Sequence, residues 1–448
     1  MPLAALAATT MLAQGDQSSL AQAVTGIQRQ FGASDQLVGL IPAAMAVCAG
    51  IGAIPVGVLA DRAKRTWLLG AVCAVWTAAM GAGALVAGIG AFFATRMIAG
   101  AAEGTPPVAI SLLSDYFPVR RRAEAMGVYQ AGAIAGAFIG LLGGGVAVQL
   151  GGWRWAFWIW VPVGAAVAIG YMFVPEPARG RQDATFDAAP GPADAAALAA
   201  QGVISLPAAD GAPAVRGVSP AAGLVAGGSG AAGTLRALRI PSMWFGTVFL
   251  TVSQLLLYGL SFWGVAYFER VHHLGPAAAG ALSIVLGAGS AIGILAGGVL
   301  ADRLLRRGNV NARVLVAAYG SIGATLLLAP AFASTQLLVT APLLFAGGIL
   351  LTVPVAPAEA LCTDVVPPEL RGRAATVRQL VRTASYAGPA LIGLLAGVIA
   401  PHSPAGLRWA IVAACPLYAV AGLIMLGALR HYPRDMAAVV AHARAGLG

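Results

Sequence analysis

The stretch Gly57-Val-Leu-Ala-Asp61-Arg62 occurs a second time in this chain, where residues 298–303 read Gly298-Val-Leu-Ala-Asp302-Arg303. Each copy ends a long apolar run and is followed by further basic residues. A match of this length at corresponding places in two parts of one chain indicates an internal duplication. We therefore expect two repeated halves.

Two further landmarks recur in the same order. Ser114-Asp115 matches Thr363-Asp364 at a constant separation of 249 residues, and each is followed by a proline and an arginine at matching positions. Arg154-Trp155 matches Arg408-Trp409. Two repeated halves of helices are a known plan of secondary transporters, in which the substrate site lies between the halves near the middle of the membrane.

The composition is that of a membrane protein and not of a water-soluble one. Of its 448 residues, 59% are hydrophobic and only 10% are charged, whereas a soluble chain has about a quarter of its residues charged. The net charge of +10 comes from small arginine clusters between apolar runs, so we expect no nucleic-acid partner. The four cysteines lie in apolar stretches without CxxC spacing, and we predict no metal site.

The apolar runs predict the helices. A helix needs about 20 mostly apolar residues to cross a bilayer. Runs of this kind occupy residues 3–28, 35–60, 67–89, 91–114, 123–149 and 153–174, and then 241–268, 276–301, 312–333, 336–361, 374–399 and 408–429. The expected fold is an all-α membrane protein with twelve transmembrane helices in two six-helix repeats.

These runs divide the chain into four parts. Residues 1–174 and 239–430 form the two six-helix bundles, and residues 431–448 form a tail. Between the bundles, 175–238 is rich in Ala, Gly, Pro and Asp and lacks helical periodicity, so we expect a disordered linker.

The basic residues predict the orientation. Twenty of them fall in the even-numbered connections and the tail, and four fall in the odd-numbered loops. Loops that stay in the cytoplasm carry the excess of Lys and Arg. We therefore expect a multi-pass protein of a bacterial inner membrane, with the linker and both termini in the cytoplasm.

The repeated stretch and the basic residues after it resemble the signature of the major facilitator superfamily, in the loop between helices 2 and 3. Within that superfamily the chain is similar to Spinster-like and anion:cation symporter-like members, on the basis of Asp16, Arg96, Glu103 and Gly388-Pro389. The drug-antiporter motif would place a proline where this chain has Ala137. Drug/proton antiport is therefore weakened by this comparison and stays open.

Three ionisable residues lie within the helices of the first half. A charge at the middle of a membrane helix costs about 2.5 to 3.5 kcal/mol, so such residues are functional candidates. We expect Asp16, with its polar neighbours, to face a water-filled cavity, although it could instead cap a helix that begins later. Arg96 and Glu103, seven residues apart, share one helix face. The resemblance implies roles in substrate and proton coupling. Asp16 is the candidate partner of Arg96, and a purely structural buried pair is the alternative.

The second half contributes a different set of candidates. Arg378 and Arg382 are four residues apart on one helix face, and either reach the headgroups or attract an anionic substrate in the cavity. Gln254 and Tyr258 share a face of helix 241–268 and are candidate cavity contacts. Glu359 is either cavity-facing or interfacial.

The duplicated signature supplies candidate gating residues. The resemblance implies that they hold the cytoplasmic side closed, while the alternative is that they are simply charges at the membrane border. They are Gly57, Asp61, Arg62, Arg65 and Asp115 in the first half, and Gly298, Asp302, Arg303 and Asp364 in the second.

These observations predict a secondary transporter that moves an organic anion or an amphipathic, lipid-like molecule by alternating access, coupled to protons. The alternatives are a drug/proton antiporter and a membrane sensor that does not transport. The sequence shows no nucleophile with a base and no Walker motif, so we expect neither an enzyme nor an ATP-driven pump. Besides the substrate, we expect membrane lipids as partners, no cofactor, and a monomer.

Overall fold

The computed structural model describes residues 2–178, 240–367, 370–401 and 403–445. The predicted linker therefore lies outside the described residues except for its first four. The predicted tail is described up to residue 445 and consists of the helix α20.

The first half consists of helices that match the six predicted spans. They are α1 (Pro2–Phe31), α2 (Asp35–Arg62), α3 (Arg65–Leu85), α4 (Ile89–Ala102), α5 (Pro106–Tyr116), α6 (Val119–Gly151), α7 (Trp155–Trp158) and α8 (Trp160–Met172). Predicted spans four and six are each made of two helices.

The second half repeats this arrangement and adds the tail helix. Its elements are α11 (Pro241–Val271), α12 (Pro276–Arg306), α13 (Ala312–Ala333), α14 (Leu337–Thr352), α15 (Val355–Asp364), α16 (Arg371–Arg382), the short 3-10 helix η2 (Thr383–Ala387), α17 (Gly388–Ile399), α18 (Pro404–Ala414), α19 (Pro416–Leu426), η3 (Gly427–Arg430) and α20 (Tyr432–Ala445).

Ten stretches of the described chain are long and apolar enough to cross a membrane. The other two predicted spans, 3–28 and 91–114, do not reach this combination of length and hydropathy, and each has a physical reason. The helix α1 is long enough, but polar residues around Asp16 interrupt its apolar character. The span 91–114 is divided between α4 and α5, and each piece is short.

Three of the predicted spans, 91–114, 336–361 and 374–399, are interrupted in the structure. α5 begins at Pro106-Pro107, α15 begins after Pro354, and α17 begins at Gly388-Pro389. Proline lacks the amide hydrogen that an uninterrupted helix needs and clashes with the preceding turn, so the breaks coincide with prolines. The first two breaks occupy equivalent places in the two halves.

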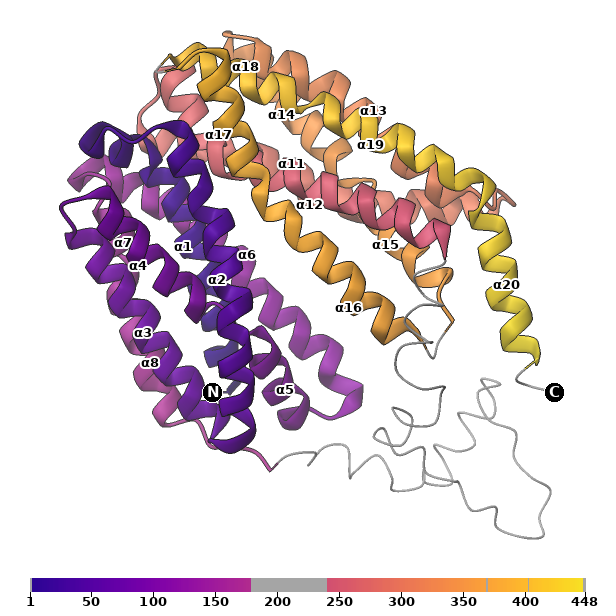
Figure 1. Cartoon of the computed structure of the whole chain (residues 1–448), viewed down its shortest axis with the longest axis horizontal. Coiled ribbons are helices and arrows are strands. Elements are labelled where there is room, and N and C mark those ends of the chain that lie inside the picture. Colours follow the sequence, from indigo (N-terminus) through magenta and orange to yellow (C-terminus); the bar gives the residue numbers. More distant parts are fainter. Residues whose placement is uncertain (1, 179–239, 368–369, 402, 446–448) are drawn as a thin grey trace.

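The two halves converge at one end of the molecule and diverge at the other, where α5, α16 and α20 lie (Figure 1). We call the end where the halves converge the far end, and the end where they diverge the linker end. Toward the far end α2 packs against α17, and α6 packs against α12. The approach is close enough that a β-carbon on Gly39 would lie 2.6 Å from the carbonyl oxygen of Pro389. Glycine is needed here for space.

A charged clasp joins the halves at the far end. Arg270, in the last turn of α11, lies 2.9 Å from the Asp35 carboxylate at the start of α2. Gln28 donates to the same carboxylate at 2.7 Å and accepts a hydrogen bond from Arg270. The far end is thus closed by side chains from both halves.

Breaking this clasp should loosen the far end. In Asp35→Asn the ion pair is lost, and since partly exposed pairs contribute about 1 kcal/mol, the population open at the far end should rise about fivefold. Dipolar spectroscopy between spin labels at Ala87→Cys and Gln336→Cys, in a background without the native cysteines, would detect a longer distance. Arg154→Gln removes an arginine whose contacts with Gln30, Val86 and Trp153 all lie within its own half and serves as control. Identical distance distributions in all three proteins would contradict the clasp.

Candidate functional site

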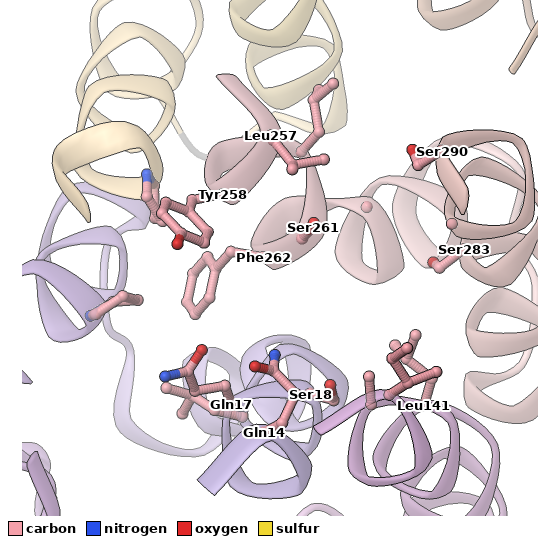
Figure 2. Close-up of a pocket in the computed structure, with 18 of the residues that line it drawn as sticks. Gln14, Gln17, Ser18, Leu141, Leu257, Tyr258, Ser261, Phe262, Ser283 and Ser290 are labelled. Carbon is pink, nitrogen blue, oxygen red and sulfur yellow. The ribbon is translucent and has the colours of Figure 1, made fainter. Parts of the chain in front are cut away.

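A cavity of about 840 Å³ lies between the two halves. Its wall is mainly apolar, with a few hydroxyl and amide groups. In Figure 2, Gln14, Gln17 and Ser18 of α1 face the rings of Tyr258 and Phe262 on α11, and Ser283 and Ser290 of α12 lie to one side. Cavities of this size, apolar with a few polar groups, are typical of small-molecule sites.

The polar stretch of α1 divides between the cavity and the interior of the first half. Gln14, Gln17 and Ser18 line the cavity. Asp16 points the other way, is fully buried, and lies 2.9 Å from the equally buried guanidinium of Arg96. The predicted partnership with Arg96 is confirmed. The expectation that Asp16 faces the cavity was wrong, because neighbouring helical positions project in different directions.

Arg96 is enclosed by groups of the first half. Its guanidinium donates to the carbonyl oxygen of Ala79 at 3.4 Å and lies over the rings of Phe92 and Phe157, 5.3 and 4.7 Å from their centroids. These contacts come from α3, α4 and α7. The pair with Asp16 therefore ties α1 to the rest of its bundle.

Glu103 lies at the break between α4 and α5 and lines the cavity. Of the lining residues in the described ranges, it is the only acidic or basic one. Its Oε2 accepts a weak hydrogen bond from Gln17 at 3.4 Å. Its Oε1 is buried and has no hydrogen-bond partner among the described residues. The site thus contains a carboxyl group with spare capacity to bind a proton or a cation.

The candidate cavity residues of the second half, Gln254 and Tyr258, lie in different surroundings. Tyr258 lines the cavity, and its ring stacks on that of Tyr386 from η2, with centroids 4.8 Å apart. Gln254, one turn earlier on α11, instead accepts a hydrogen bond from Arg382 at 3.2 Å. Sequence reasoning missed Tyr386, although the following Gly388-Pro389 marks the irregular turn that presents it.

Glu359 joins the two arginines of α16. Its carboxylate forms ion pairs with Arg378 and Arg382. None of the three residues is among those that line the cavity. The three residues form a cluster within the second half.

The predicted gating residues are arranged symmetrically in the two halves. Arg65 lies 2.6 Å from Asp115, and Arg313 forms the equivalent ion pair with Asp364. Each pair lies within one half. Arg313 was not among the predicted gating residues, although it follows Arg65 by 248 residues, close to the spacing of the two aspartates.

The remaining gating candidates make fewer contacts. Asp61, Arg62, Asp302 and Arg303 are exposed at the ends of their helices. A β-carbon on Gly57 would meet nothing within 4 Å, and one on Gly298 would only reach ordinary contact with Ala356. Their gating role stays a prediction.

Glu176, just after α8, completes the cluster around Arg65. It lies 2.8 Å from Arg65 and also accepts a hydrogen bond from the backbone amide of Thr66 at 2.9 Å. Burial by itself disfavours its charge, but these hydrogen bonds outweigh burial and hold the pKa of Glu176 below its ordinary value. The residue that leads into the linker is therefore fixed to the first half as an anion.

Helices that span a membrane in two repeated halves, with a shared central cavity between them, define a transporter architecture. The comparison with known proteins identifies which one. The sequence matches the Major Facilitator Superfamily over residues 6–387, and the chain belongs to this family.

Similar curated proteins include two resistance proteins, one of which is named as an export protein, and a probable transporter. The chain is 32% identical to the tetracenomycin C resistance and export protein of Streptomyces glaucescens, over 41% of this chain and 35% of that protein. It is 28% identical to a puromycin resistance protein of Streptomyces alboniger, over 40% and 36%. It is 26% identical to a probable L-galactonate transporter of Escherichia coli, over 35% of each. The matches span about a third of these relatives.

Solved structures share the fold over nearly the whole chain. A bacterial homologue of the human lysosomal transporter Spinster, in an inward-facing and unoccupied conformation, superposes with a TM-score of 0.77 at 20% identity and 97% coverage of both chains. A D-xylose–proton symporter gives 0.66 at 14% identity, covering 94% and 96%. The predicted fold and family are confirmed.

Removing one charge of the buried Asp16–Arg96 ion pair should destabilise the protein more than removing both. Asp16→Asn leaves a buried guanidinium without its counter-charge, which costs about 3 to 5 kcal/mol. We expect a clear loss of melting temperature in detergent. The double variant Asp16→Asn with Arg96→Met removes both charges and should recover most of that loss. Additive effects of the two substitutions would show that the ion pair does not stabilise the bundle.

Proposed function

We propose that this protein is a proton-coupled secondary transporter that moves an amphipathic small molecule by alternating access. The observation that supports this proposal is the central cavity, whose wall is apolar except for small polar groups and one carboxyl group. Glu103 is the residue we expect to carry the proton.

The surroundings of Glu103 suit reversible protonation. Removal from water favours the neutral form of a carboxyl group, whereas a wetter conformation favours the anion. Among the described residues, the amide of Gln17 donates to it at 3.4 Å, and this bond is long. A change in the hydration of the cavity would therefore change its proton occupancy. We expect the Asp16–Arg96 pair to fix the helices that present this group.

The conformation fits one state of an alternating-access cycle. The clasp of Arg270 and Asp35 closes the far end, and the halves diverge at the linker end (Figure 1). In the orientation expected from the arginine distribution, the cavity faces the cytoplasm of a bacterial cell. We propose that opening of the far end requires the clasp to break and the linker end to close, with no cofactor and with one chain as the functional unit.

The cavity wall favours an amphipathic solute over a small carboxylate. No arginine, lysine or histidine belongs to the part of the wall that the structure describes. An organic anion would need to recruit Arg378 and Arg382, which are paired with Glu359. Drug/proton antiport is the second candidate, because two similar curated proteins have names that denote resistance or export.

The test is a pH-jump assay on the purified protein in liposomes, with lysolipids, carboxylates and cationic drugs as solutes. We expect solute-dependent proton movement in the wild type and at least a tenfold slower rate in Glu103→Gln, because an amide cannot exchange the proton. Glu124→Gln, a matched change at an exposed carboxylate of α6, should behave as the wild type. Proton movement that is unaffected by Glu103→Gln would reject proton coupling through this residue.

A further inference from the structure

The stacked rings of Tyr258 and Tyr386 form an aromatic wall on one side of the cavity. The two ring planes are only 10° from parallel, and both residues line the cavity. Phe262, one turn after Tyr258 on α11, extends the same side and points toward α1 (Figure 2). An aromatic face attracts cations as well as apolar groups.

Hydrogen bonds and an ion pair of the second half hold the aromatic wall in position. Tyr386 belongs to η2, which follows directly on Arg382. Arg382 is bonded both to Gln254, one turn before Tyr258, and to Glu359. The helices α11 and α16 are therefore joined next to the stacked pair. A wall that is already ordered loses little conformational entropy when a solute binds.

Glu103 supplies the charge that this wall lacks. Its carboxyl group lines the same cavity as Tyr386 and Tyr258. Gln17 of α1 donates a hydrogen bond to it. Asp16 of α1 and Arg96 of α4 are the other charged groups that act on it, from inside the first half. Since Asp16 and Arg96 neutralise one another, the described wall of the cavity carries a net charge of minus one when Glu103 is ionised.

We propose that the solute is an amphipathic organic monocation, held between the Tyr258–Tyr386 wall and the Glu103 carboxylate, and that this cation and a proton compete for that carboxylate. The proposal rests on the function proposed above and narrows its substrate class. When the cation binds, the proton on Glu103 leaves, and when the cation leaves, a proton returns. One positive charge thus replaces another, so exchange moves no net charge and should not respond to membrane potential.

Two probes of equal shape and opposite charge test the proposal. Tetraphenylphosphonium is an aromatic monocation, and tetraphenylborate is the corresponding anion. Equilibrium dialysis with the full chain in detergent should show saturable binding of the cation only. In weakly buffered solution, binding should release about one proton per cation in the wild type and none in Glu103→Gln, which also should bind the cation at least tenfold more weakly.

The aromatic wall is tested by separate variants. Tyr386→Leu should weaken tetraphenylphosphonium binding about tenfold, in line with the strength of a desolvated cation–π contact. Tyr386→Phe keeps the ring and should bind within about twofold of the wild type. Tyr319→Leu changes a tyrosine that is 64% exposed on the outside of α13 and should have no effect.

Preference for tetraphenylborate, or cation binding without proton release, would overturn the proposal. Failure of this proposal is distinguishable from failure of the proposed function. If anionic solutes move protons in liposomes and Glu103→Gln abolishes this movement, proton coupling stands and only the cationic class is wrong. If no solute moves protons through Glu103, the proposed function itself fails.

Discussion

The structure depends on one constraint, which is that the membrane interior offers no water to satisfy polar groups. Backbone that leaves the helical pattern must then be enclosed by protein or face a cavity. Two of the breaks in this chain meet that condition at the central cavity, where Glu103 ends α4 and Tyr386 sits in η2. The same constraint explains why Asp16 and Arg96, which are fully buried, form an ion pair. Irregular backbone thus lies at the cavity, while this charged pair is enclosed within one half.

The two halves repeat their layout but not their chemistry. By the spacing of the duplicated landmarks, Thr352 corresponds to Glu103, and Tyr258 corresponds to Gln17. All four residues line the cavity. The first half supplies an amide and a carboxyl group there, whereas the second supplies an aromatic ring and a hydroxyl group. Duplication thus preserved the positions that face the cavity while the functional groups diverged.

Most of the fold could be predicted from the sequence, because the bilayer thickness fixes the length of an apolar run and the duplicated stretch fixes the number of halves. The partnership of Asp16 and Arg96 could also be predicted, since a buried charge needs a partner. The direction of Asp16 could not, because it depends on the rotation of α1 within its bundle. Glu359 and its two arginines show the same limit, since their contact depends on how α15 packs near α16. The helix breaks could not be predicted from prolines alone, because Pro42, Pro55 and Pro330 lie inside unbroken helices. Only the fold shows which breaks reach the cavity.

The last helix of the chain is attached firmly to one half. The hydroxyl group of Tyr432, at the start of α20, donates to the Asp364 carboxylate at 2.9 Å, and Asp435 accepts from the backbone amide of Ser242 at 3.2 Å. These contacts bind α20 to both α15 and α11. A fluorescent reporter fused behind this helix would therefore follow the second half as a rigid body. Paired with a dye on the first half, it would report the rocking of one half against the other directly.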